Sequence, residues 1–125
     1  MKININELVQ IGNLCEKFSN RVVSARLAYK LAKLSKAISE DINFYQEKYI
    51  EYLEMFGERD ENGDFVSNKG NIKIISGLEQ ECKEKFNELN SIEVEIPNIK
   101  FSLEELEQLN MTMKDMLVFD LFVDE

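Results

Sequence analysis

The longest regular pattern in the chain is a series of apolar residues at helical spacing between Ser24 and Phe56. No Gly or Pro interrupts the series, and Gly57 follows where a helix commonly ends. At 1.5 Å per residue, the pattern predicts one helix of roughly 50 Å. Its aromatic residues more often belong to a core, at this spacing, than to a ligand-facing wall. The apolar positions are Leu27, Leu31, Leu34, Ile38, Ile42, Tyr45, Tyr49, Tyr52 and Phe56.

A second helical pattern follows a polar loop. Residues 57–71 are mostly polar and contain Asn62-Gly63, a strong turn signal. Beyond the loop, a helix is predicted over 72–90, and we expect it to fold back along 38–56 as a helical hairpin. Its apolar positions are Ile75, Leu78, Cys82, Phe86 and Leu89.

Shorter elements flank the hairpin on both sides. Asn6 is a candidate N-cap for a helix that ends near Phe18. Strands are expected at 2–5, 21–24 and 92–96, where apolar and polar residues alternate or β-branched residues cluster. We expect these three strands to form one small sheet.

The C-terminal region carries two helix-start signals. Ser102 and Glu105 form a capping-box pattern, and Thr112 begins a further short helix. The whole pattern predicts a single domain over residues 1–125 with an α+β, mostly helical fold. It would consist of a long helical hairpin, a small β-sheet and short C-terminal helices.

The composition excludes several kinds of catalytic site. The chain has no His, which removes Ser-His and Cys-His nucleophile activation and most transition-metal sites. Its two cysteines, Cys15 and Cys82, lie far apart on apolar helical stripes, so we expect both to be reduced and buried. We therefore expect a protein that is not an enzyme and has no catalytic residues and no cofactor.

The loop contains a calcium-like set of oxygen ligands that fails on spacing. Asp60, Asn62 and Asp64 alternate as the first ligands of an EF-hand loop do. That loop requires Gly at its sixth position and Glu at its twelfth, where this chain has Phe65 and Asn71. A solvated turn fits these residues better, and no metal site is expected.

Charge is distributed unevenly along the chain. Residues 1–36 carry seven basic and two acidic side chains, for a net +5, whereas 37–125 carry eight basic and 22 acidic ones, for −14; the total is −9. Arg26, Lys30 and Lys33 share one helical face, which would bind an anionic partner or pair with acids of the same chain. Because these bases come without the row of aromatic residues that forms a stacking platform, direct nucleic-acid binding is not favoured.

Two apolar regions of the sequence must be buried, either by another part of the chain or by a partner. Leu27, Leu31 and Leu34 extend beyond the shorter helix of the hairpin, so the N-terminal helix or a second copy in a homodimer must bury them. The run from Met113 to Val123 must pack on the core or on a partner. The candidate partner-binding residues are Arg26, Lys30, Lys33, Leu27, Leu31, Leu34, Phe119 and Phe122.

Several stretches together resemble one protein family. They are residues 26–34, 56–63, 93–96 and 99–106, together with the acidic apolar tail that contains Phe119-Asp120-Leu121-Phe122. In these stretches the chain is similar to small acidic helical proteins of Gram-positive phages and prophages, a family with no established activity. The resemblance implies a phage origin and brings no catalytic residue with it.

These observations favour a protein that works by contact with other proteins. We expect a non-enzymatic phage or prophage accessory protein, either an assembly factor or a modulator of a host protein, in the cytoplasm of a bacterial cell. No apolar run is long enough to span a membrane. The alternative is an inhibitor of a host defence or nucleic-acid-processing system, acting by acidic DNA mimicry or ligand sequestration.

Overall fold

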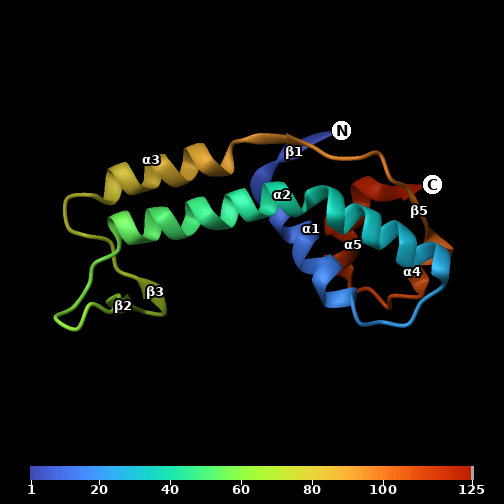
Figure 1. The fold of residues 1–125 in the computed structure, drawn as a ribbon, viewed down its shortest axis with the longest axis horizontal. Coiled ribbons are helices and arrows are strands. Elements are labelled where there is room, and N and C mark those ends of the chain that lie inside the picture. The colour runs from blue at the N-terminus through green and yellow to red at the C-terminus, as the bar shows by residue number, and fades with distance from the viewer. Residues whose placement is uncertain (125) are drawn as a thin grey trace.

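The computed structural model describes residues 1–124 and is 59% helical, which confirms the predicted α+β, mostly helical class (Figure 1). Short strands precede, connect and follow the helices. In chain order the elements are β1 (Lys2–Asn4), α1 (Ile5–Phe18), α2 (Ala25–Phe56), β2 (Ser67–Asn68), β3 (Asn71–Ile72), α3 (Glu79–Asn90), β4 (Glu93–Glu95), β5 (Phe101–Ser102), α4 (Leu103–Glu107), α5 (Met113–Phe119), a 3₁₀ turn (Asp120–Phe122) and β6 (Val123–Asp124).

Helix α2 runs along the length of the molecule and belongs to two different regions (Figure 1). The Ser24 hydroxyl caps its first turn by accepting from the Leu27 amide at 3.3 Å, and Gly57 ends it as predicted. The first half of α2 lies in what we call the head, residues 1–39 and 91–124. Its second half pairs with α3 to form the arm, residues 40–90, which projects from the head.

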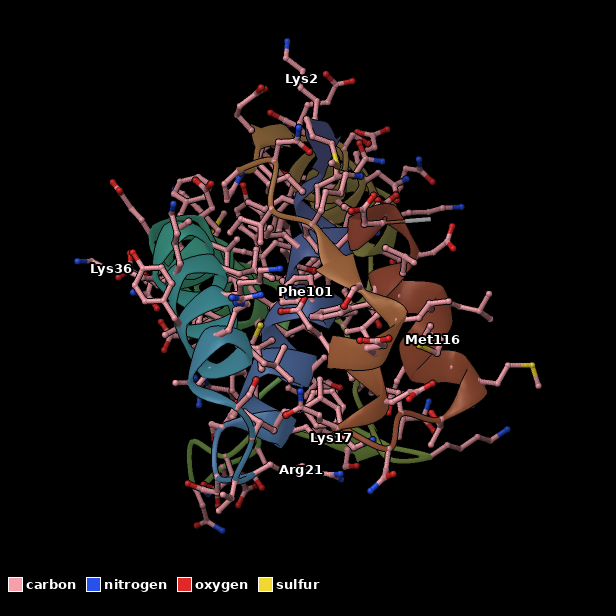
Figure 2. All side chains as sticks on the ribbon, turned by 90° about the vertical axis from the view of Figure 1, so that its right-hand side faces the viewer. Lys2, Lys17, Arg21, Lys36, Phe101 and Met116 are labelled. Carbon is pink, nitrogen blue, oxygen red and sulfur yellow. The ribbon has the colours of Figure 1, made fainter. Side chains whose placement is uncertain are left out.

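The head contains the main hydrophobic core. Helix α1 crosses α2 closely at Gly12, where a Cβ atom would collide with Cδ1 of Ile42. Figure 2 shows Phe101 in the interior, between α1 and the C-terminal helices. The rings of Phe101, Phe119 and Phe122 pack together with centroids 5.4–6.3 Å apart, and Phe122 meets the other two edge-on. The predicted capping box of α4 is present, and Thr112 and Asp115 form a second one at the start of α5.

The arm has only two layers. Helix α3 folds back along α2 as predicted, and the Phe86 ring meets Tyr49 and Tyr52 edge-on at 5.2 and 5.5 Å. The Tyr45 hydroxyl donates to the Asn90 side chain at 2.8 Å. A polar loop closes the arm, with a hairpin whose tip, Lys69-Gly70, has two positive φ angles.

The prediction of a three-stranded sheet is wrong for residues 21–24. Strands β1 and β4 pair antiparallel, Ile3 opposite Val94, but residues 21–24 are not a strand. They form the connection into α2: the Arg21 guanidinium donates to the Leu109 carbonyl, and Val22 is fully exposed. β-Branched residues alone do not make a strand when no neighbour is in place to pair with them.

Two predicted helix starts are also wrong. The second hairpin helix begins at Glu79, not at 72, because Gly77 has φ +93° and the Ile75 amide donates to the Phe56 carbonyl at 2.8 Å. These contacts hold 72–75 extended against the end of α2. Helix α1 begins at Ile5 rather than after Asn6, since the Ile5 amide is bonded to the Ile92 carbonyl beside β4.

Candidate interaction surfaces

Four of the predicted partner-binding residues lie inside the head core. Leu27, Leu34, Phe119 and Phe122 are fully buried, and Leu31 is half-buried. These four therefore form no contact surface in this structure, which corrects the prediction. The head itself covers the leucines, as the internal-packing alternative required, so they give no reason to expect a homodimer.

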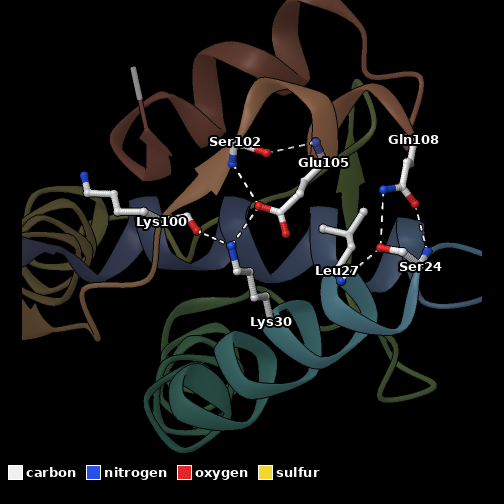
Figure 3. A network of polar contacts seen from close by, with 7 residues as sticks. All are labelled: Ser24, Leu27, Lys30, Lys100, Ser102, Glu105 and Gln108. Carbon is white, nitrogen blue, oxygen red and sulfur yellow. Dashed lines mark hydrogen bonds and ion pairs between the residues drawn. The ribbon is translucent and has the colours of Figure 1, made fainter.

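The basic residues of the predicted site separate into one paired lysine and two exposed side chains. Lys30 reaches the Glu105 carboxylate at 2.7 Å and the Lys100 carbonyl at 2.8 Å (Figure 3). Arg26 and Lys33 remain exposed and form no salt bridge within residues 1–124. Only these two of the three predicted bases are available to a partner.

The contact between Lys30 and Glu105 is mainly structural. The hydrogen bond from Lys30, and then the one from the Ser102 amide, hold the pKa of the Glu105 carboxyl below its usual value. The second oxygen of Glu105, Oε2, is buried and accepts no hydrogen bond within the described chain, and this desolvation offsets part of the gain. The pair fastens α2 to α4, with Ser24 and Gln108 bonded beside it (Figure 3).

A similar contact fastens α1 to α5. Lys17 donates to Asp115 at 2.8 Å, and Asp115 also caps α5 by bonding the Thr112 amide. The hydrogen bond from Lys17 is the main cause that lowers the pKa of Asp115, whose side chain is largely buried. Lys17 lies 98 positions from Asp115. The sequence allowed Lys30 to pair with an acid of the same chain but did not identify Glu105 as that acid, and no sequence pattern signalled the contact between Lys17 and Asp115.

Two highly exposed apolar side chains of the head lie on α5. Met113 and Leu117 are 80% and 71% exposed, although the sequence suggested that the whole C-terminal run would be covered. They are one turn apart on the side of α5 opposite Phe119. Leu117 also borders a shallow hollow between α1 and α5 that includes Val118 and Leu121. We call Met113, Leu117, Val118 and Leu121 the α5 strip.

The remaining candidates for chemistry have structural explanations. Cys15 and Cys82 are free and buried as predicted, and burial raises the pKa of Cys15 to about 11 and also raises that of Cys82. Asp60 accepts from the amides of Asn62 and Asp64, which is a turn within the loop. Within residues 1–124, no group of three or more metal-ligating side chains comes together. The helices described there are all too short or too polar to span a membrane.

Comparison with known proteins adds no relative to this picture. No family model, no curated protein and no solved structure matches the chain. The function must therefore be inferred from its surfaces.

Proposed function

We propose that this chain is a non-enzymatic phage or prophage accessory protein that binds another protein through the α5 strip. The exposure of Met113 and Leu117 on consecutive turns is the observation that carries the proposal. The phage assignment is supported by the resemblance of residues 26–34, 56–63 and the C-terminal segment to phage proteins. Assembly of a phage particle and modulation of a host protein both fit such a contact.

The energetics favour a protein partner with an apolar centre. Burial of an exposed Met or Leu side chain stabilises a complex by about 1.5–3 kcal/mol. Glu7 lines the same hollow as Leu117, Asp120 precedes Leu121 in the chain, and both acidic residues are exposed. A partner that matches this arrangement presents apolar side chains with basic residues around them, so that the rim charges select the partner and its orientation.

The proposal is tested by affinity purification from phage-infected cells with the wild type and with Met113→Glu/Leu117→Glu. A partner contacting the strip is retained by the wild type and lost with the double variant. The partner is then purified and its affinity measured by calorimetry, where we expect a loss of at least about 100-fold, or ~2.7 kcal/mol.

A matched control keeps the interpretation specific. Val22→Glu introduces the same acidic group at a fully exposed apolar position in the loop before α2. It should bind the partner as the wild type does, and all variants should keep the wild-type melting temperature. A purified partner that binds the double variant with unchanged affinity would show that the α5 strip is not the contact.

The second candidate function is inhibition by acidic mimicry, and the arm favours it. Residues 40–90 carry 13 acidic and six basic side chains, for a net −7. The carboxylates of Glu79, Glu81, Glu84 and Glu88 on α3 are all exposed. Mimicry predicts that DNA competes with the arm for a common partner and that salt weakens binding strongly. Binding through the α5 strip predicts no competition by DNA and a weaker salt dependence, which arises only from the charges around the strip.

A further inference from the structure

The solvent-facing side of α2 carries a second regular stripe that no element within residues 1–124 covers. Its residues are separated by three and four positions in turn, as in a heptad repeat, and all of them are exposed. They are Arg26, Tyr29, Lys33, Lys36, Glu40, Asn43, Glu47, Ile50 and Glu54. Lys36 illustrates the geometry: Figure 2 shows it pointing away from α1 into solvent. The stripe extends from the head to the end of the arm.

Charge divides this helix into two opposite halves. Residues 25–39 carry four basic side chains and no acid, a net +4, whereas 40–56 carry five acids and one base, a net −4. On the exposed stripe the bases are Arg26, Lys33 and Lys36, and the acids are Glu40, Glu47 and Glu54. These six form no salt bridge within residues 1–124.

This order of charges opposes the helix dipole. The first turn of α2 contains no acid and the last turn no base. A base at the N-terminus and an acid at the C-terminus each destabilise an isolated helix by a few tenths of a kcal/mol. An antiparallel neighbour with the same charge order reverses this effect, because it places acids beside the basic half and bases beside the acidic half.

We infer that a second copy of this chain packs antiparallel against the exposed stripe of α2, giving a two-fold symmetric dimer centred near Glu40. A two-fold interface requires a surface that is complementary to itself when reversed, and the +4 and −4 halves of α2 meet that requirement. With residue 40 at the axis, Arg26 lies opposite Glu54 of the second copy, and Lys33 lies opposite Glu47. At the axis Glu40 faces Glu40 of the second copy, and Lys36 of each copy, one turn away, offsets the repulsion between these two carboxylates.

The exposed apolar residues of the stripe meet in the same alignment. Tyr29 is 70% exposed in the basic half and Ile50 is 57% exposed in the acidic half. The two-fold axis at residue 40 places Tyr29 of one copy beside Ile50 of the other, on both sides of the axis. The apolar contacts therefore agree with the register that the charge pairs define.

The inferred dimer is independent of the α5 strip. The stripe uses only α2, whereas Met113 and Leu117 lie on α5 at a different face of the head. One helix face of about 48 Å gives an interface near the lower end of stable protein–protein contacts. We therefore expect a reversible dimer, with monomers appearing on dilution.

The test is a charge exchange followed by sedimentation equilibrium on the full chain. Lys33→Glu and Glu47→Lys, made singly, each create two like-charge contacts across the two-fold axis. Each should weaken dimerisation by at least about tenfold, or ~1.4 kcal/mol. The double variant Lys33→Glu/Glu47→Lys exchanges the two charges and should restore most of the wild-type affinity.

Control variants separate this contact from net charge and from folding. Glu88→Lys changes the charge by the same two units as Glu47→Lys, at an exposed site on α3. It should dimerise like the wild type, and so should Met113→Glu/Leu117→Glu. A wild type that is monomeric at high micromolar concentration would overturn the inference, as would a double variant no better than the single ones. If such a monomer still binds a partner through the α5 strip, the proposed function stands and only the dimer is rejected.

Discussion

The head and the arm share one helix but are stabilised very differently. The head buries 16 apolar side chains in one continuous cluster, whereas the fully buried apolar residues of the arm are Phe56, Cys82 and Leu89. In the head, α1 and the C-terminal segment both cover α2. In the arm, α3 covers only one side of α2, and edge-on contacts of the Phe86 ring with two tyrosines form much of the interface. The apolar stripe of α2 is thus fully enclosed in the head but only partly buried in the arm.

This difference indicates that a long helix can stabilise a region that has only a small hydrophobic core of its own. A two-helix arm of this size is marginal in isolation, because it buries too little apolar surface to offset its conformational entropy. Continuity of α2 from Ala25 to Phe56 anchors the arm to the head. The head should therefore determine global stability, while the arm should open locally at a lower free energy.

The largest effect is expected from a cavity in the head. Phe119→Ala removes a fully buried ring that packs against Phe101 and Phe122. We expect it to destabilise the protein by about 3–5 kcal/mol in chemical denaturation. Leu117→Ala, on the exposed side of the same helix, is the control and should change stability by less than ~0.5 kcal/mol. Equal effects of the two substitutions would contradict the buried position of α5.

A smaller and local effect is expected from the matching change in the arm. Phe86→Ala removes the half-buried ring between Tyr49 and Tyr52, at a cost of about 1–3 kcal/mol. Hydrogen exchange should show faster opening of α3, with little change in α1. Met55→Ala, at an exposed position of the arm, should leave both unchanged. Acceleration that is uniform across the chain would show that head and arm unfold as one unit.

The sequence predicted the regions that are defined by long periodicity. Helix α2 was recognised from end to end because nine apolar positions and Gly57 agree. Residues 72–78 were misassigned because their apolar spacing also fits an extended segment. The positive φ of Gly77 and the bond from Ile75 to Phe56 depend on tertiary contacts. Local pattern alone could not distinguish these conformations.

The surfaces were less predictable than the elements, for a related reason. The short α5 has seven residues, so its apolar pattern fits more than one face. Asp115 on the buried side and Leu117 on the exposed side reverse the usual rule, because Lys17 and the cap neutralise the cost of burying the carboxylate. Lys30 and Glu105, 75 positions apart, could be paired only in three dimensions.

Acidification should weaken the head through two of its inter-segment ion pairs, Lys30–Glu105 and Lys17–Asp115. The pKa values of Glu105 and Asp115 are lowered from 4.5 and 3.8, so the folded state holds these protons less tightly than the unfolded chain. Their stabilising contribution is complete above about pH 5 and is lost as the pH falls through the lower folded-state pKa values. Because Lys17 and Lys30 keep partial contact with solvent, we expect at most ~1 kcal/mol from each pair.

The measurement is the free energy of unfolding between neutral pH and pH 3. Glu105→Gln and Asp115→Asn should each flatten the acid limb of this curve while lowering stability at neutral pH. Glu81→Gln, exposed on α3, should leave the acid limb unchanged. An unaltered pH dependence in both head variants would show that neither ion pair persists in solution.

The smallest effect concerns reaction rates of the two cysteines, with no change in stability. Both thiols are buried and have raised pKa values, so each should be alkylated slowly in the folded protein. Cys15 lies in the head core and Cys82 in the arm. Because reaction requires opening, Cys82 should be alkylated first, as followed by mass spectrometry, and the two rates should converge in denaturant. Phe86→Ala should accelerate alkylation of Cys82 and leave Cys15 unaffected. If Cys15 reacted first, the head rather than the arm would be the less stable region, and the inferred anchoring of the arm by α2 would be wrong.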